Sequence, residues 1–230
     1  MSSSADNPET TSVGPGDLDF SEKGKKLIHM YENMVNNGYN RVSQPKVEVA
    51  YQDFELKLMK KTVRDTFHKF QIRTVLDYGS GRGNWNKKIY NDNTISAFDY
   101  FNLDKVYQFE PTISNSEKKI ADCVMCFDVL EHIFISDLKN VIADIYNYSR
   151  KIVIIKVACY DAKAKLPNGE NAHITVRNPM WWKGFLDSVS SEFEEISTLL
   201  ICTTKDKKFL FFKPWSLEKW NQFPNYKVDF

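Results

Sequence analysis

The chain contains the stretch Val75-Leu76-Asp77-Tyr78-Gly79-Ser80-Gly81-Arg82-Gly83-Asn84, and this stretch decides the fold. Its apolar start predicts a buried strand that ends in an acidic residue and runs into a glycine-rich turn. Glycine at 79, 81 and 83 permits positive φ and lets a ligand approach the backbone closely. A helix expected from Asn84 onward would point free N–H groups at the same place. The stretch therefore predicts a nucleotide-binding loop in an α/β fold.

The spacing of the glycines narrows the class of ligand further. A dinucleotide fingerprint has the spacing G-x-G-x-x-G and holds the pyrophosphate at a helix N-terminus. Here the third glycine, Gly83, comes one residue early, and Asp77 would repel an anionic pyrophosphate. An NAD enzyme is therefore the disfavoured alternative.

The order Asp-x-Gly-x-Gly-x-Gly after a strand resembles the first motif of class I S-adenosylmethionine-dependent methyltransferases. The cofactor that this resemblance implies carries a cationic sulfonium and ammonium, and Asp77 suits that charge. The cofactor-binding residues implied by the loop are Asp77, Tyr78, Gly79, Ser80, Gly81 and Gly83. The alternative is a glycine-rich turn of another α/β protein that binds no cofactor.

Two more segments agree with that resemblance. Residues 94–99 read as a short apolar strand ending in Asp99, 22 residues after Asp77, which fits a carboxylate that binds ribose hydroxyls. Residues 123–127 form a continuous apolar run typical of a buried parallel strand. They lead into Asp128-Val129-Leu130-Glu131-His132, which resembles the family's fourth-strand motif. Asp128 and Val129 are therefore expected beside the cofactor; the alternative is an acid that simply ends the strand.

Composition indicates one domain. The 230 residues are 42% hydrophobic and 27% charged, and the net charge is +1. A net charge this close to zero does not attract polyanions, so the sequence does not support nucleic acid as a partner. We expect a disordered tail at 1–20 and a single methyltransferase domain at 21–230. Within this domain we expect N-terminal helices at 21–70, a Rossmann-like core at 71–213 and an aromatic tail at 214–230, which either covers the core or pairs with another subunit.

We find in the sequence neither a segment typical of a targeting signal nor a motif typical of a metal site. The N-terminus lacks the basic and apolar regions of a secretory signal, and no apolar run is long enough to span a bilayer, so we expect a cytoplasmic protein without membrane contact.

The pair Cys123-x-x-Cys126 lies on an expected strand, where side chains three apart point to opposite faces. These two sulfurs could not converge on zinc, and we predict no metal site and no disulfide.

The remaining pattern predicts an α/β fold of the Rossmann-like class I methyltransferase type, with a mostly parallel central sheet and a C-terminal antiparallel hairpin. Helical periodicity marks residues 27–35, 54–70, 135–145 and 179–193, and strand patterns mark 151–157, 197–202 and 209–213. The first helix either lies over the cofactor mouth as a lid or packs as an ordinary amphipathic helix. Only 23 residues separate Asp99 from Cys123, so one element of the fold is missing or shortened there.

The acceptor is expected near a polar loop that ends in a histidine. The motifs Asp-Tyr-Gly-Ser-Gly, Asp-Val-Leu-Glu-His, Leu-Pro-x-Gly-x-Asn-Ala-His and Trp-Trp together resemble small uncharacterised bacterial and phage class I methyltransferases. His173 and Asp128 are the candidate catalytic residues, since a histidine can take a proton from a hydroxyl or amine as the methyl group transfers. Asn171, Trp181 and His132 are the candidate acceptor-binding residues. For both histidines the alternative is a purely structural role.

These observations predict a methyltransferase that transfers a methyl group from S-adenosylmethionine to an O or N atom of a small-molecule or sugar-containing acceptor. Two alternatives stay open. One is an enzyme that acts on RNA, DNA or protein, and the other is a non-catalytic binding protein on the same fold.

Overall fold

The computed structural model describes residues 18–48, 55–88, 94–113, 116 and 118–215. Most of the expected N-terminal tail, and the aromatic tail from residue 216 onward, lie outside the described residues. In chain order the elements are α1 (Glu22–Asn37), β1 (Tyr39–Arg41), β2 (Gln44–Val47), α2 (Glu55–Leu58), α3 (Lys60–Phe70), β3 (Thr74–Tyr78), α4 (Ala97–Tyr100), β4 (Lys105–Phe109), β5 (Ala121–Phe127), a 3₁₀ turn η1 (Leu130–His132), α5 (Ile135–Asn147), β6 (Ser149–Ala158), α6 (Pro179–Ser190), β7 (Ser197–Thr203) and β8 (Phe209–Trp215).

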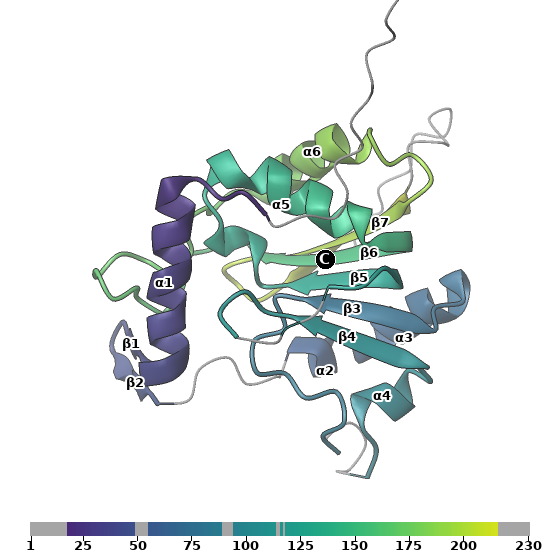
Figure 1. The fold of residues 1–230 in the computed structure, drawn as a ribbon, viewed down its shortest axis with the longest axis horizontal. Helices are drawn as coiled ribbons and strands as arrows, with labels where there is room; N and C mark the ends of the chain where they lie inside the picture. The colour runs from purple at the N-terminus through teal and green to yellow at the C-terminus, as the bar shows by residue number, and fades with distance from the viewer. Residues whose placement is uncertain (1–17, 49–54, 89–93, 114–115, 117, 216–230) are drawn as a thin grey trace, which may run out of the picture.

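A six-stranded sheet with the order β4-β3-β5-β6-β7-β8 forms the centre of the molecule (Figure 1). The first five strands are parallel, and β8 pairs antiparallel with β7. The mostly parallel sheet and the C-terminal hairpin confirm the predicted fold class. Strand order reverses between β3 and β5, because the chain passes from β3 outward to β4 and then returns to the other side of β3. Such a switch point is where α/β sheets bind ligands, outside the carboxyl ends of the strands.

Each face of the sheet is covered by its own helices (Figure 1). One apolar cluster joins Leu76, Val124 and Cys126 to α5 and α6. The other joins Val75 and Cys123 to α2 and α3. The two cysteines of the Cys-x-x-Cys pair are thus buried on opposite faces, which confirms that they cannot share a ligand.

Local sequence signals explain where the long helices begin and end. Ser21 caps α1 by accepting a hydrogen bond from the Gly24 amide, and Gly38 ends it with φ of 72°. Asn178 caps α6 in the same way, and Pro179 occupies its first position. None of the helices in the described part of the chain combines the length and apolarity needed to cross a membrane.

Two expectations about the first half of the sheet are wrong. Residues 94–99 do not form a strand: Ser96 accepts a hydrogen bond from the Asp99 amide and donates one to the Asp99 carboxylate, a capping box that begins α4. The neighbour of β3 is instead β4, which ends at Phe109. Likewise, residues 84–88 form turns rather than the helix expected from Asn84.

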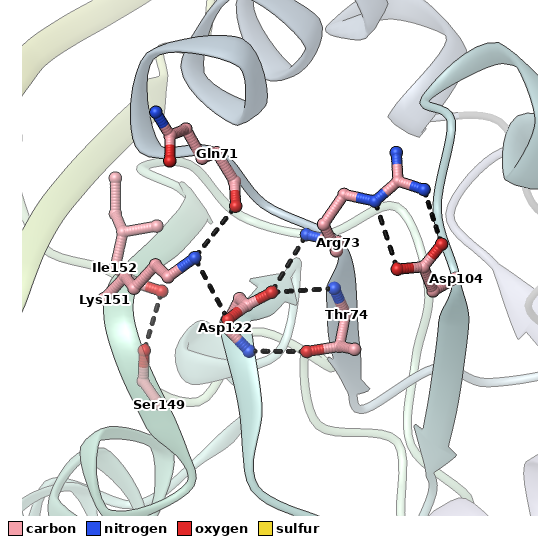
Figure 2. Close-up of polar contacts among 8 residues, drawn as sticks. All are labelled: Gln71, Arg73, Thr74, Asp104, Asp122, Ser149, Lys151 and Ile152. Atoms are coloured by element: carbon pink, nitrogen blue, oxygen red, sulfur yellow. Dashed lines mark hydrogen bonds and ion pairs between the residues drawn. The ribbon is translucent and has the colours of Figure 1, made fainter.

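At the amino ends of the strands, Asp122 ties β5 to β3 (Figure 2). Its Oδ2 accepts hydrogen bonds from the Arg73 amide at 2.9 Å and the Thr74 amide at 3.1 Å. Its own amide donates to Thr74 Oγ1 at 2.8 Å, and Lys151 of β6 forms an ion pair with its carboxylate at 3.2 Å. These contacts lie at the end of the sheet opposite to the cavity described below.

Candidate functional site

A cavity of about 290 Å³ opens at the carboxyl ends of β3, β4 and β5, at the switch point of the sheet. One wall consists of residues at or just beyond the ends of these strands: Asp77, Gly79, Ser80, Gly81, Glu110 and Asp128. The opposite wall is α1 with the residue before its cap, and it contributes mostly apolar side chains: Phe20, Leu27, Ile28, Tyr31 and Val35. The cavity therefore has polar groups on the sheet side, among apolar residues such as Met125, Phe127 and Val129, and a mostly apolar wall formed by α1.

The glycine loop takes a conformation that other residues would resist. Gly79 and Gly81 both have positive φ, of 76° and 54°. A Cβ at Gly79 would also collide with the Val129 side chain, which lines the cavity directly against the loop. The Gly79 amide donates to the Phe109 carbonyl at 2.7 Å, and the Gly81 amide donates to Glu110 Oε2 at 3.0 Å. The loop is thus held against the end of β4 with its backbone facing the cavity.

Two carboxylates stand on either side of this loop. Asp77 is the fourth residue of β3, and its Oδ2 accepts a hydrogen bond from the Trp85 indole at 2.8 Å. Glu110 directly follows β4, and its Oε1 accepts from the Thr112 amide and hydroxyl at 3.1 and 2.8 Å. Because β3 and β4 are adjacent and parallel, both carboxylates reach the same cavity.

Asp128 lies just beyond β5 and carries a buried counter-charge. Its φ is 54°, and its two carboxylate oxygens lie 2.6 and 2.7 Å from the Lys156 ammonium. Lys156 is 2% exposed, so this ion pair neutralises a lysine that the sequence places within the buried strand β6. An acid engaged in this way is poorly placed to accept a proton from an acceptor.

His132 also lines the cavity, and its ring is fixed by α1 and by the loop after β6. Its Nδ1 lies 2.7 Å from the Tyr31 hydroxyl and 2.9 Å from the Ala172 carbonyl, to which the Tyr31 hydroxyl also donates. Burial, followed by the neighbouring His173 ring, lowers the pKa of His132 to about 3. The imidazole is therefore neutral at physiological pH, and because a carbonyl only accepts, its proton sits on Nδ1.

Glu131 and His173 lie behind His132. Glu131 is fully buried, and its Oε1 accepts a hydrogen bond from the Ala158 amide at 2.7 Å. Burial, together with the nearby Asp128 charge, raises the pKa of Glu131 well above its ordinary value. His173 holds its Nδ1 against the Tyr160 carbonyl, and burial lowers its pKa as well.

Helix α1 is tied to the rest of the site at its first turn. The buried Asp137 of α5 accepts hydrogen bonds from the Ser21 amide at 3.1 Å and from the Ser21 hydroxyl at 2.8 Å. Leu27 and Met34 pack against Leu166 and Ala172 of the loop after β6. Tyr31 and its neighbours on α1 line the cavity, and the lid role of this helix stays a prediction.

The loop after β6 does not bring all the predicted acceptor residues together. Asn171 uses its side chain to fold the loop, accepting from the Ala162 and His173 amides at 2.9 Å each and donating to the Ala162 carbonyl. Trp181 stacks on Phe185 at 5.0 Å within α6. Neither side chain lines the cavity, both have structural contacts, and their predicted contact with an acceptor stays a prediction.

Four other predicted residues are also displaced from the cavity. His173 reaches it only through its contact with His132, whose ring centroid is 4.8 Å away. Tyr78 is a core residue that donates to Asp144 at 2.7 Å. Asp99 is exposed on α4, where it serves the capping box, and it is not among the residues that line the cavity. Gly83 only shapes the loop, its amide donating to the Ser80 carbonyl.

Sequence reasoning missed Glu110, Lys156 and the α1 side chains. The signal for Glu110 was an alternating run over 105–109 that ends in an acid, the same pattern that marked Asp77. The signal for Lys156 was a charge inside an otherwise apolar run, which requires a partner once the run is a buried strand.

The mostly parallel sheet, the glycine loop after β3, and the carboxylates at the ends of β3 and β4 define an α/β methyltransferase of class I. A protein-family model described as a methyltransferase domain matches residues 48–221, which is most of the chain. The chain therefore belongs to this methyltransferase family and is an S-adenosylmethionine-dependent enzyme. Neither the curated proteins nor the solved structures contain a significant match to it.

Proposed function

We propose that this enzyme transfers the methyl group of S-adenosylmethionine to an O or N atom of a small-molecule or sugar-containing acceptor, within the cavity between the sheet and α1. The observation that carries the proposal is the division of this cavity into a polar side beside the glycine loop and an apolar side covered by α1. The polar side suits the cofactor, and the covered side suits a compact acceptor.

The cofactor side has groups for the ribose and for the charged methionine part of S-adenosylmethionine. Glu110 stands at the end of the strand next to β3, where a carboxylate accepts hydrogen bonds from ribose hydroxyls. Asp77 offers a negative charge to the ammonium and sulfonium. The positive φ of Gly79 and Gly81 brings the backbone close to the ligand. In this proposal Glu110 takes the ribose role that the sequence suggested for Asp99.

The acceptor side is closed by α1, which favours a small acceptor over a polymer. Phe20, Leu27 and Ile28 give this wall an apolar character, while the His132 imidazole supplies a polar group on the sheet side. An acceptor that fits here has an apolar part against α1 and a hydroxyl or amine near His132. A nucleic acid or a folded protein would need α1 to move, and the net charge of +1 offers no field to attract a polyanion.

Methyl transfer from S-adenosylmethionine mainly requires that the acceptor be correctly positioned. Sulfonium is already a good leaving group, so holding acceptor and methyl group in line and excluding water supplies much of the acceleration. Asp128 is neutralised by Lys156, and His132, with a pKa of about 3, takes up no second proton at neutral pH and is a weak base. We propose that His132 orients the acceptor by a hydrogen bond and that the proton leaves to solvent.

The test is a turnover assay that follows S-adenosylhomocysteine release with a panel of hydroxyl and amine compounds, sugar conjugates, total RNA, DNA and protein. The proposal predicts turnover with one of the small acceptors. It also predicts that Ile28→Trp, which fills the apolar wall, lowers kcat/KM for that acceptor at least tenfold with little change in cofactor affinity. Turnover only with RNA, DNA or protein would contradict it.

A further inference from the structure

Three side chains beside the cavity form a cluster that the proposed methyl transfer does not use as a whole: Glu131, His132 and His173. One ligand-type atom of each lies within 4.8 Å of those of the other two. Glu131 and His132 belong to η1 and His173 to the loop after β6, so elements far apart in sequence bring them together. The two imidazole rings meet edge to face at 4.8 Å.

Hydrogen bonds favour, in both histidines, the tautomer of a metal ligand. Nδ1 of His132 faces the Ala172 carbonyl at 2.9 Å, and Nδ1 of His173 faces the Tyr160 carbonyl. A carbonyl only accepts, so each Nδ1 carries the proton and each Nε2 keeps a free lone pair. A backbone carbonyl that holds the far nitrogen of an imidazole is the usual support of a metal-bound histidine.

Glu131 supplies the second, independent observation. Its side chain is fully buried, and within the described residues its Oε2 has no hydrogen-bond partner, whereas Oε1 accepts from the Ala158 amide. A buried carboxylate oxygen without a partner costs free energy that a bound cation would offset. The nearest buried cation, Lys156, is already paired with both oxygens of Asp128.

We propose that Glu131, His132 and His173 bind one divalent first-row transition-metal ion such as Zn²⁺. Two neutral imidazoles and a carboxylate are a ligand set that suits this class of ion and does not suit Mg²⁺. Donors on one ion at about 2.1 Å are at most about 4.2 Å apart, so the three side chains close in by small rotations when the ion binds. With the ion bound, Nε2 of His132 is a ligand, and an open position of the metal would take over the contact with the acceptor that the proposed function gives to His132.

We predicted no metal site from the sequence because we considered only the cysteines as ligands. The binding signal lay instead in Glu131-His132 together with a third ligand 41 residues further along. Only the return of the chain after β6 brings His173 beside the other two.

The test is metal binding by the full-length chain after dialysis against a chelator, without S-adenosylmethionine. We expect calorimetric titration with ZnCl₂ to show one saturable site per chain and Zn K-edge absorption to show two imidazole donors. His173→Gln, in the half-buried loop, is expected to weaken Zn²⁺ binding at least about tenfold. Glu131→Gln, which keeps an acceptor for the Ala158 amide, is expected to do the same.

His29→Ala is the matched control. This histidine lies on α1 with 76% of its side chain exposed, and its loss should leave Zn²⁺ affinity unchanged. Circular dichroism checks that each variant is folded, and His173→Gln alone decides the matter if Glu131→Gln does not fold. Absence of saturable binding to the wild-type chain, or equal affinity in folded His173→Gln, would overturn the proposal. Because no methyl donor is present, the result is independent of the proposed function.

Discussion

Replacing Asp122 separates the contribution of its hydrogen bonds from that of its charge. In Asp122→Ala the amides of Arg73 and Thr74 lose their shared acceptor, Oδ2, and Lys151 loses its ion pair (Figure 2). Two hydrogen bonds to a charged acceptor at about 1.5 kcal/mol each give a loss of about 3 kcal/mol in the free energy of unfolding. In Asp122→Asn a carbonyl oxygen can still accept both amides, so we expect a loss of about 1 kcal/mol. Urea denaturation at pH 7 measures both.

The matched control is Asp104→Asn. This carboxylate also binds Arg73, but through an exposed guanidinium pair, and its loss should change stability little. Equal losses in Asp122→Ala and Asp122→Asn would refute the reasoning, because they would show that the amides find other acceptors. A loss in Asp104→Asn as large as in Asp122→Ala would refute it as well.

The same contacts predict how stability depends on pH. Burial raises the pKa of Asp122, but the Arg73 and Thr74 amides and the Lys151 ammonium outweigh it and hold that pKa below its ordinary value. A carboxyl group with a lowered pKa in the folded state stabilises the fold above its unfolded-state pKa of about 3.9. This stabilisation is lost as the pH falls through the lower folded-state pKa. The stability difference between wild type and Asp122→Asn should therefore be constant from pH 7 to 5 and shrink below pH 4; a difference that grows with acid would contradict the assignment.

Three further variants test the site. Gly79→Ala should weaken S-adenosylmethionine binding about tenfold or more, since its Cβ would meet the Val129 side chain and displace the loop beside the cavity at a cost of about 1–3 kcal/mol, whereas Gly169→Ala, also at positive φ but with open space around its Cβ and outside the cavity lining, should bind normally. Glu110→Gln should weaken cofactor binding by calorimetry about tenfold, which is the loss of one hydrogen bond to a charged acceptor, while Asp99→Asn should not; the reverse result would return the ribose role to Asp99. Tyr31→Phe should cost about 1 kcal/mol of unfolding free energy by urea denaturation, and an unchanged value would mean that its hydroxyl does not hold α1 to the loop after β6.

The parallel strands were readable from sequence because burial on both faces demands continuous apolar runs. Residues 123–127 and 151–157 lie within β5 and β6, which extend them by one or two residues at their ends. The strand that sequence missed, β4, is less buried and alternates in polarity, and a competing segment nearby looked more apolar. That segment, 94–99, begins with Ser96, whose capping of Asp99 determines the helix in place of a strand.

Only part of the candidate site could be predicted from the sequence, because only part of it consists of local patterns. The glycine loop and the acids after β3 and β5 are local patterns, so the sequence indicated Asp77 and Asp128 directly. The partners of these residues come from distant segments. Lys156 is paired to Asp128 by strand order, and α1 reaches the cavity through contacts with Asp137 and the loop after β6. The spacing of these residues along the chain does not predict these contacts.

The central claim is that the cavity at the switch point binds S-adenosylmethionine through the glycine loop and Asp77. Calorimetric titration of the full-length chain with S-adenosylmethionine, S-adenosylhomocysteine and NAD, repeated with Asp77→Asn, tests it most directly. The Asn variant keeps an acceptor for the Trp85 indole and removes only the charge. We predict saturable binding of both methionine compounds, none of NAD, and affinity at least about tenfold lower in the variant. Folded wild-type protein that binds neither methionine compound, or that binds NAD instead, would contradict the account.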